Sequence, residues 1–213
     1  MKKTISIICM IALSAGTVMQ AQLQDNDRRE KISIGGRAGI NVSNVWDATG
    51  EDFVADPKTG FAGGIFIGIP MGKYLGIQPE FLVSQKGFRG SGTILAAPYS
   101  FSKTTTFIDI PLQLQLKPVS FLTIVAGPQF SYMIKEKNTY TLGGNVAEQE
   151  EAFAADNIRK NILGFGVGID AIISRLVLSG RLGWDMQDNH GDGTSSTPRY
   201  KNQWVQFTLG IKL

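Results

Sequence analysis

Residues 106–117 read Thr-Phe-Ile-Asp-Ile-Pro-Leu-Gln-Leu-Gln-Leu-Lys, and this stretch decides the fold class. The apolar aliphatic residues occupy every second position: Ile108, Ile110, Leu112, Leu114 and Leu116. Polar residues dominate the intervening positions. Because successive side chains of a strand point to opposite faces, this period of two predicts a strand with one apolar face.

The same alternation recurs along the rest of the chain. The alternating segments are 32–43, 61–69, 75–87, 106–117, 122–132, 163–171, 176–186 and 203–213. Their number is even, and each has about the length that a tilted strand needs to cross a bilayer. No stretch after the N-terminal region reaches the roughly 18 apolar residues of a membrane-spanning helix. The pattern predicts an all-β protein, an eight-stranded antiparallel up-and-down transmembrane β-barrel.

The connections between the segments alternate in length. Short turns are expected near 70–73, 117–120 and 173–175, and long polar loops at 44–60, 88–103, 135–160 and 187–200. Bacterial outer-membrane barrels have short periplasmic turns and longer extracellular loops. We therefore expect both termini and the short turns in the periplasm, and the long loops outside the cell.

The polar phase of the segments distinguishes a membrane barrel from a soluble β-fold. A soluble sandwich or lipocalin-like barrel would place a broad mixture of lysine and glutamate on its outer face. Here glycine, serine, glutamine and threonine dominate, with isolated charges that include Arg37, Glu80, Lys86, Asp109, Asp170 and Arg181. An eight-stranded lumen is just wide enough for side chains to fill, so we expect these six to pair into a network that plugs it.

The N-terminus resembles a secretory signal. Residues 1–21 combine a lysine-containing start, an apolar run and a small residue before Gln22, which predicts a cleaved signal peptide. We expect residues 22–31 to form a short periplasmic segment and residues 32–213 to form the barrel. The single cysteine, Cys9, lies within the predicted signal, so the mature chain would have no disulfide and no thiol ligand.

The composition argues against a helical bundle and against a nucleic-acid-binding protein. Glycine accounts for 25 of 213 residues, spread through apolar stretches, which suits a barrel better than a helical bundle. The net charge is +3 and basic residues form no continuous stripe, so a nucleic-acid partner is not expected.

Several motifs resemble a known family. They are Gly39-Ile-Asn-Val-Ser43, Gly60-Phe-Ala-Gly-Gly64, Gln78-Pro-Glu-Phe-Leu-Val-Ser-Gln-Lys-Gly87, Ile108 to Pro118, Ala126-Gly-Pro-Gln-Phe-Ser-Tyr132 and the terminal Phe207-Thr-Leu-Gly-Ile-Lys-Leu213. Their order and extent resemble the PorT-like outer-membrane β-barrel family of Bacteroidetes-type bacteria. The resemblance implies the barrel fold and the outer membrane. It implies little about activity, because function does not follow from fold alone.

Enzymatic and ligand-binding motifs are weak. The only histidine, His190, lies in a predicted loop, where it could combine with Asp185 or Asp188 and with Ser195 or Ser196 in a rim enzyme. A solvated loop histidine is the commoner case. Residues 188–199 fail as a calcium loop, and 164–168 lie within a predicted strand and lack the helix that a nucleotide-binding glycine motif requires. No catalytic, cofactor or metal site is predicted.

The long loops carry two distinctive patches. Glu148, Glu150, Glu151 and Asp156 predict a solvated, acidic loop helix, with a cation or partner site as the alternative. The apolar patch 94–101 either prolongs a hairpin beyond the bilayer or contacts a partner. We expect the following aromatic residues to form interfacial girdles: Trp46, Trp184, Trp204, Tyr74, Tyr99, Tyr132 and Tyr200.

These observations predict a non-enzymatic outer-membrane barrel that anchors the membrane or displays loops to a partner. A component of a secretion or outer-membrane assembly apparatus is the alternative, and a lipid-modifying rim enzyme or a narrow pore a minor one. The expected partners are outer-membrane lipid, the barrel assembly machinery during biogenesis, and a protein bound by loops 88–103 and 135–160.

Overall fold

The computed structural model describes residues 29–45, 55–94, 97–142, 145–152, 160–187 and 201–213. Within these ranges the chain forms nine strands: β1 Ser33–Val45, β2 Ala55–Pro70, β3 Leu75–Ile94, β4 Ala97–Val119, β5 Leu122–Leu142, β6 Asn145–Ala152, β7 Asn161–Ile173, β8 Leu176–Asp185 and β9 Asn202–Lys212. Among the described residues there is no helix long and apolar enough to cross a membrane.

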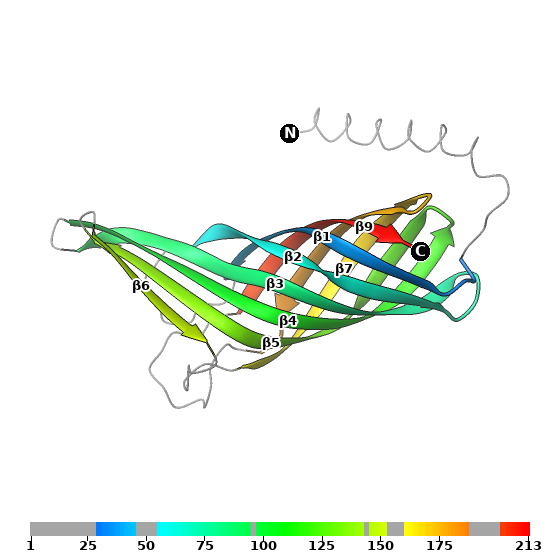
Figure 1. The fold of residues 1–213 in the computed structure, drawn as a ribbon, viewed down its shortest axis with the longest axis horizontal. Coiled ribbons are helices and arrows are strands. Elements are labelled where there is room, and N and C mark those ends of the chain that lie inside the picture. Colours follow the sequence, from blue (N-terminus) through cyan, green and yellow to red (C-terminus); the bar gives the residue numbers. More distant parts are fainter. Residues whose placement is uncertain (1–28, 46–54, 95–96, 143–144, 153–159, 188–200) are drawn as a thin grey trace.

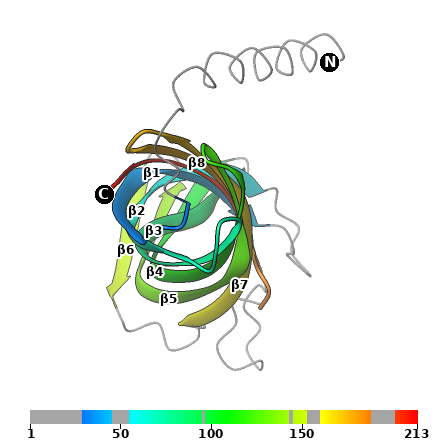
Figure 2. The same ribbon diagram turned by 90° about the vertical axis from the view of Figure 1, so that its right-hand side faces the viewer.

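Eight of these strands close into a barrel (Figure 2). Their order around the ring is β4-β3-β2-β1-β9-β8-β7-β5, and pairing of β4 with β5 completes the circle. Every neighbouring pair is antiparallel, including the first strand β1 with the last strand β9. The predicted eight-stranded antiparallel barrel is confirmed.

The barrel is apolar outside and polar inside. On β4, Leu112 is 51% exposed and Leu114 is 53% exposed, whereas the intervening Gln113 is 2% exposed. The same alternation gives β9 its regular pattern of buried and exposed residues. Since a soluble barrel buries its apolar face, the soluble alternative is wrong.

The short turns gather at one end of the barrel, which we call the turn rim (right in Figure 1). It comprises residues 29–32, 71–74, 117–121, 173–176 and 212–213. Gly72 has φ 132°, a conformation that glycine adopts at little cost, and Met71 N donates to Leu75 O at 3.0 Å. The three predicted short turns therefore lie where the alternation of the sequence indicated.

Long hairpins extend from the opposite end of the barrel (left in Figure 1). β3 pairs with β4 up to Ile94 and Ala97, β4 pairs with β5 up to Leu142, and β6 pairs along the outer part of β5. We call residues 88–94, 97–105, 135–142 and 145–152 the projecting sheet. Ile94 and residues 97–101, the described part of the apolar patch, thus prolong a hairpin, as one of its two interpretations proposed.

The structure corrects the prediction for residues 135–160. Instead of a long loop with an acidic helix, residues 135–142 continue β5, and Glu148, Glu150 and Glu151 lie on strand β6. Asp156 lies outside the described residues. Residues 145–152 pair along the edge of β5, and the backbone hydrogen bonds of this ladder outweigh the poor strand propensity of glutamate.

Candidate functional site in the barrel lumen

The six charged residues predicted to face the lumen are all buried, between 1% and 7% exposed. They are Arg37, Glu80, Lys86, Asp109, Asp170 and Arg181. Three positive and three negative charges make their sum zero. Contacts divide them into a four-residue group nearer the turn rim and a Lys86–Asp109 pair further along the lumen.

The four-residue group is centred on Glu80 and Arg181. Arg181 Nη1 donates to Glu80 Oε2 at 2.8 Å, and Arg181 Nη2 lies 2.8 Å from Glu80 Oε1. Arg37 and Arg181 each approach Asp170 Oδ2 to 3.5 Å. Two guanidinium groups therefore share two carboxylates, and this alternation offsets the cost of burying each charge.

Neutral polar side chains and an aromatic ring complete this group. Gln78 Nε2 donates to Glu80 Oε1 at 2.6 Å, and Arg37 Nη1 donates to Ser179 Oγ at 3.3 Å. The Arg37 guanidinium also lies 4.3 Å from the centroid of the Phe66 ring. These contacts hold Glu80 and Arg37 in place inside the lumen.

The Glu80–Arg181 contact spans the barrel. Glu80 lies on β3 and Arg181 on β8, and three strands separate β3 from β8 in either direction around the ring. A bidentate ion pair therefore joins diametrically opposite walls. Because it crosses the full width of the lumen, it obstructs passage at this depth.

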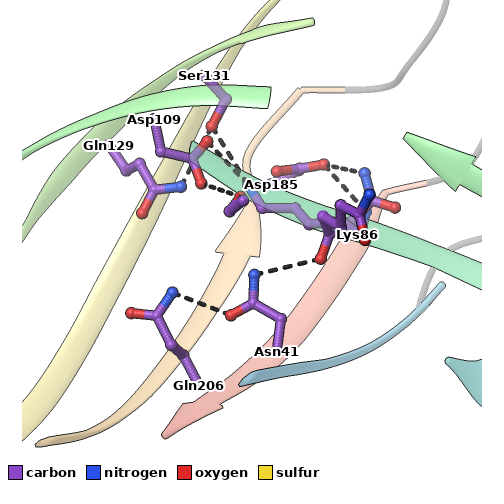
Figure 3. A network of polar contacts seen from close by, with 10 residues as sticks. Asn41, Lys86, Asp109, Gln129, Ser131, Asp185 and Gln206 are labelled. Carbon is purple, nitrogen blue, oxygen red and sulfur yellow. Dashed lines mark hydrogen bonds and ion pairs between the residues drawn. The ribbon is translucent and has the colours of Figure 1, made fainter. Parts of the chain in front are cut away.

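Lys86 forms a second layer across the lumen (Figure 3). Its Nζ lies 3.2 Å from Asp109 Oδ1 and donates to Ser131 Oγ at 3.3 Å, while Ser84 Oγ donates to Asp109 Oδ2 at 2.5 Å. The ammonium also lies 3.9 Å from the centroid of the Trp204 ring. A carboxylate, a hydroxyl and an aromatic face thus replace the water that Lys86 loses on burial.

Trp204 is the clearest residue that the sequence interpretation misplaced. Instead of joining an interfacial girdle it is 5% exposed and lies inside the barrel. Its partner across the β8–β9 ladder is Gly183, and a Cβ on Gly183 would overlap the indole ring. Trp204 shares the inward phase of β9 with Gln206 and Thr208, so its position in the alternation was the signal that could have placed it.

Two clusters of buried apolar side chains lie toward the projecting sheet. Phe107, Met133 and Ile162 form one buried cluster, and Val45 with Phe88 forms another, against which Phe101 packs. The rings of Phe88 and Phe101 meet edge to face, with centroids 5.8 Å apart. The sequence interpretation had assigned closure to charges alone and did not identify these clusters.

The base of the projecting sheet carries its own polar contacts. Lys103 Nζ lies 2.9 Å from Glu136 Oε1, and Lys58 Nζ donates to Ser102 Oγ at 2.6 Å and to Thr104 Oγ1. Burial lowers the pKa of Lys58, and the nearby cations Arg89 and Lys137 lower it further. These contacts join β2, β4 and β5 beyond the membrane-facing band.

The residues considered for a rim enzyme are not assembled in the described part of the chain. Asp185 is buried and accepts hydrogen bonds from Asn202 N at 3.1 Å and from Asn202 Nδ2 at 2.7 Å. His190, Asp188, Ser195 and Ser196 lie outside the described residues. Across the described ranges, no group of three or more metal-ligating side chains comes together.

A closed antiparallel barrel with an apolar outer wall fits the comparison with known protein families. Residues 20–190 match the family of the outer membrane protein beta-barrel domain. The chain belongs to this family. It is therefore an outer-membrane β-barrel protein.

Solved structures similar to this outer-membrane barrel come from several bacteria. Ail, the attachment invasion locus protein of Yersinia pestis, is 10% identical with a TM-score of 0.46, covering 85% of this chain and 98% of Ail. Neisserial surface protein A is 10% identical, with a TM-score of 0.43 and coverages of 85% and 97%. OprG from Pseudomonas aeruginosa is 11% identical, with a TM-score of 0.40 and coverages of 89% and 99%. No curated protein matches the chain.

Proposed function

We propose that this chain is a non-enzymatic outer-membrane barrel with a plugged lumen, which anchors in the membrane and presents its projecting sheet to a protein partner. The observation that carries the proposal is the Glu80–Arg181 ion pair across the barrel. With Lys86 and the apolar clusters above it, this pair leaves the lumen occupied at successive depths. A wide aqueous pore has no room there.

A protein partner would then bind a surface other than the lumen and the barrel wall. Lipid covers the apolar wall, and the turns at the turn rim are only a few residues long. The projecting sheet offers a much larger surface, and β6 pairs with β5 on one side only within the described residues. An exposed strand edge of this kind can accept an extended segment of another chain.

The proposal also covers the orientation of the barrel in the outer membrane and the subfamily to which the chain belongs. Short turns and long hairpins support a periplasmic turn rim and an extracellular projecting sheet. Residues 1–21 would be the signal peptide and 22–31 the periplasmic segment. The PorT-like resemblance of the motifs supports a subfamily within the outer-membrane barrels, and a role in secretion would follow only from the partner's identity.

Copurification from detergent-solubilised membranes tests the partner. Two truncations preserve strand register: replacing 91–100 by Asn-Gly leaves the pair Gly90 and Phe101, and replacing 139–148 by Asn-Gly leaves the pair Asn138 and Gln149. We expect both proteins to fold and insert, with heat-modifiable migration in detergent, and at least one to lose a partner that the parent retains.

Deletion of residues 22–28, which precede the turn rim in the chain, is the matched control. If both truncated proteins kept the partner and this deletion lost it, the interaction would lie at the turn rim and the assignment to the projecting sheet would be wrong. Secretion components among the captured proteins would favour the alternative function.

A lipid-hydrolysis assay tests the absence of enzymatic activity. The parent and His190→Ala should both fail to release fatty acid from outer-membrane lipid. Hydrolysis by the parent that His190→Ala abolishes would replace this proposal with the rim-enzyme alternative.

A further inference from the structure

Basic side chains are concentrated at the turn rim. In the described part of the rim they are Arg29, Lys31, Lys73, Lys117, Arg175 and Lys212. Among the described rim residues, only the carboxylate of Glu30 stands against these six. The six lumen charges described above sum to zero, so those six groups do not offset this excess. We call the six residues the basic collar.

Backbone contacts between neighbouring turns bring the collar residues together. Lys117 N donates to Tyr74 O at 2.7 Å, which places Lys117 beside the turn that carries Lys73. Lys212 N donates to Arg175 O at 2.7 Å, which brings these two basic residues side by side. The collar is therefore a consequence of how the turns pack, and it gathers like charges around one end of the barrel.

Arg29 fixes the chain across the same rim. Its Nη1 donates to Pro118 O at 3.3 Å, its guanidinium lies 5.4 Å from the centroid of the Tyr74 ring, and Lys117 Nζ donates to Arg29 O at 2.8 Å. Lys31, Lys73 and Arg175 are exposed. Arg29 and the buried Lys117 are thus held in place by contacts, Lys212 is partly buried, and the other three collar residues are exposed.

The exposed members lie at the edge of the lipid-facing band. Lys31 precedes Ile32, which is 67% exposed, Lys73 precedes the exposed Tyr74, and Arg175 lies between the exposed Ile173 and Leu176. Apolar side chains this exposed contact the acyl region, while an adjacent lysine or arginine extends its charge to the headgroups. These three exposed members of the collar therefore lie at headgroup depth.

We propose that the exposed members of the basic collar, Lys31, Lys73 and Arg175, bind the phosphate headgroups of anionic phospholipids in the leaflet that surrounds the turn rim. Gathered cations repel one another, and lipid phosphates at the same depth neutralise them. The flanking apolar residues favour a lipid over a free anion, because they contact the acyl chains of the same molecule. In the orientation proposed above, this leaflet is the periplasmic one.

Spin-labelled lipids measure this preference directly. The full barrel is reconstituted in phosphatidylcholine vesicles, and the fraction of motionally restricted label is compared for phosphatidylglycerol and phosphatidylcholine. We expect phosphatidylglycerol to associate about threefold or more in excess over phosphatidylcholine at low salt. The excess should disappear in 1 M NaCl, where the screening length falls to about 3 Å.

A matched pair of triple variants assigns the preference to the collar. K31Q/K73Q/R175Q should bring the ratio of the two lipids close to one, while R89Q/K135Q/K160Q, which removes three basic residues beyond the opposite end of the band, should leave it unchanged. Heat-modifiable migration establishes that each variant is folded.

Three outcomes would overturn the proposal. They are an equal association of the two lipids with the parent, a preference that survives in the collar variant, and a preference that only the opposite-end variant removes. A preference abolished by inorganic phosphate, but not by sodium chloride of equal ionic strength, would instead identify a free-anion site. None of these outcomes depends on the lumen or on a protein partner.

Discussion

The indole ring of Trp204 occupies the space beside Gly183 that any larger residue at position 183 would need. The same ring lies under the Lys86 ammonium, 3.9 Å from its centroid. A glycine on β8 therefore makes room for a tryptophan on β9, which in turn supports a buried lysine on β3. Gly183 is therefore part of the packing of the lumen, because its missing side chain leaves the space that the Trp204 ring fills.

Gly183→Ala should destabilise the barrel by about 1–3 kcal/mol, because its Cβ would displace the Trp204 ring. Gly180→Ala is the matched control on the same strand, since its Cβ would meet only Phe207, at 3.8 Å. We expect Gly180→Ala to change stability by less than about 1 kcal/mol. Unfolding in urea from lipid vesicles measures both, and equal effects would contradict this account of Trp204.

Glu80→Gln should destabilise the barrel by about 3–5 kcal/mol. It leaves Arg37 and Arg181 buried with Asp170 as their only carboxylate in the four-residue group. The double variant E80Q/R181Q removes one charge of each sign and restores neutrality. It should therefore lose less stability than the sum of the two single variants, and strict additivity in this cycle would show that the ion pair is not coupled.

The sequence predicted the lumen charges because alternation assigns each side chain to a face. Glu80 and Arg181 both fall in the polar phase of their segments, and a closed eight-stranded barrel leaves that phase only a narrow interior. The sequence could not show which of these charged side chains contact one another. The contact between β3 and β8 depends on the order of strands around the ring and on their stagger, which local alternation does not contain.

Strand β6 was missed for a different physical reason. Asn145–Ala152 is rich in glutamate and has no apolar alternation, so local preference argued against a strand. It pairs because β5 continues to Leu142 and presents an unpaired edge beyond the end of β7. Trp204 was misplaced for the opposite reason. Its position in the alternation of β9 pointed into the barrel, but the sequence interpretation gave more weight to the frequency of tryptophan at membrane interfaces.

Planar-bilayer recording tests the closed lumen. The parent should give no stable wide conductance, and only rare small openings, because two charged layers and two apolar clusters occupy the interior. E80A/R181A, which removes the contact across the barrel, should raise the frequency of openings. A steady, wide conductance from the parent would contradict the plugged lumen and the function proposed from it.

Lysine substitutions at different depths test the position of the membrane on the barrel wall. Leu112 lies in the middle of the apolar run of β4 and is 51% exposed, so Leu112→Lys places a charge near the centre of the bilayer and should cost about 2–4 kcal/mol. Ile32 is even more exposed but lies at the turn rim beside Lys31, so Ile32→Lys should cost no more than about 1 kcal/mol.

Gln113→Ser, on the lumen side next to Leu112, controls for a change of polarity within the strand and should cost little, because it adds no charge. Unfolding in urea from lipid vesicles gives all three values. If Ile32→Lys proved as costly as Leu112→Lys, the hydrocarbon region would extend beyond the turn rim, and the headgroup depth assigned to the exposed members of the basic collar would be wrong.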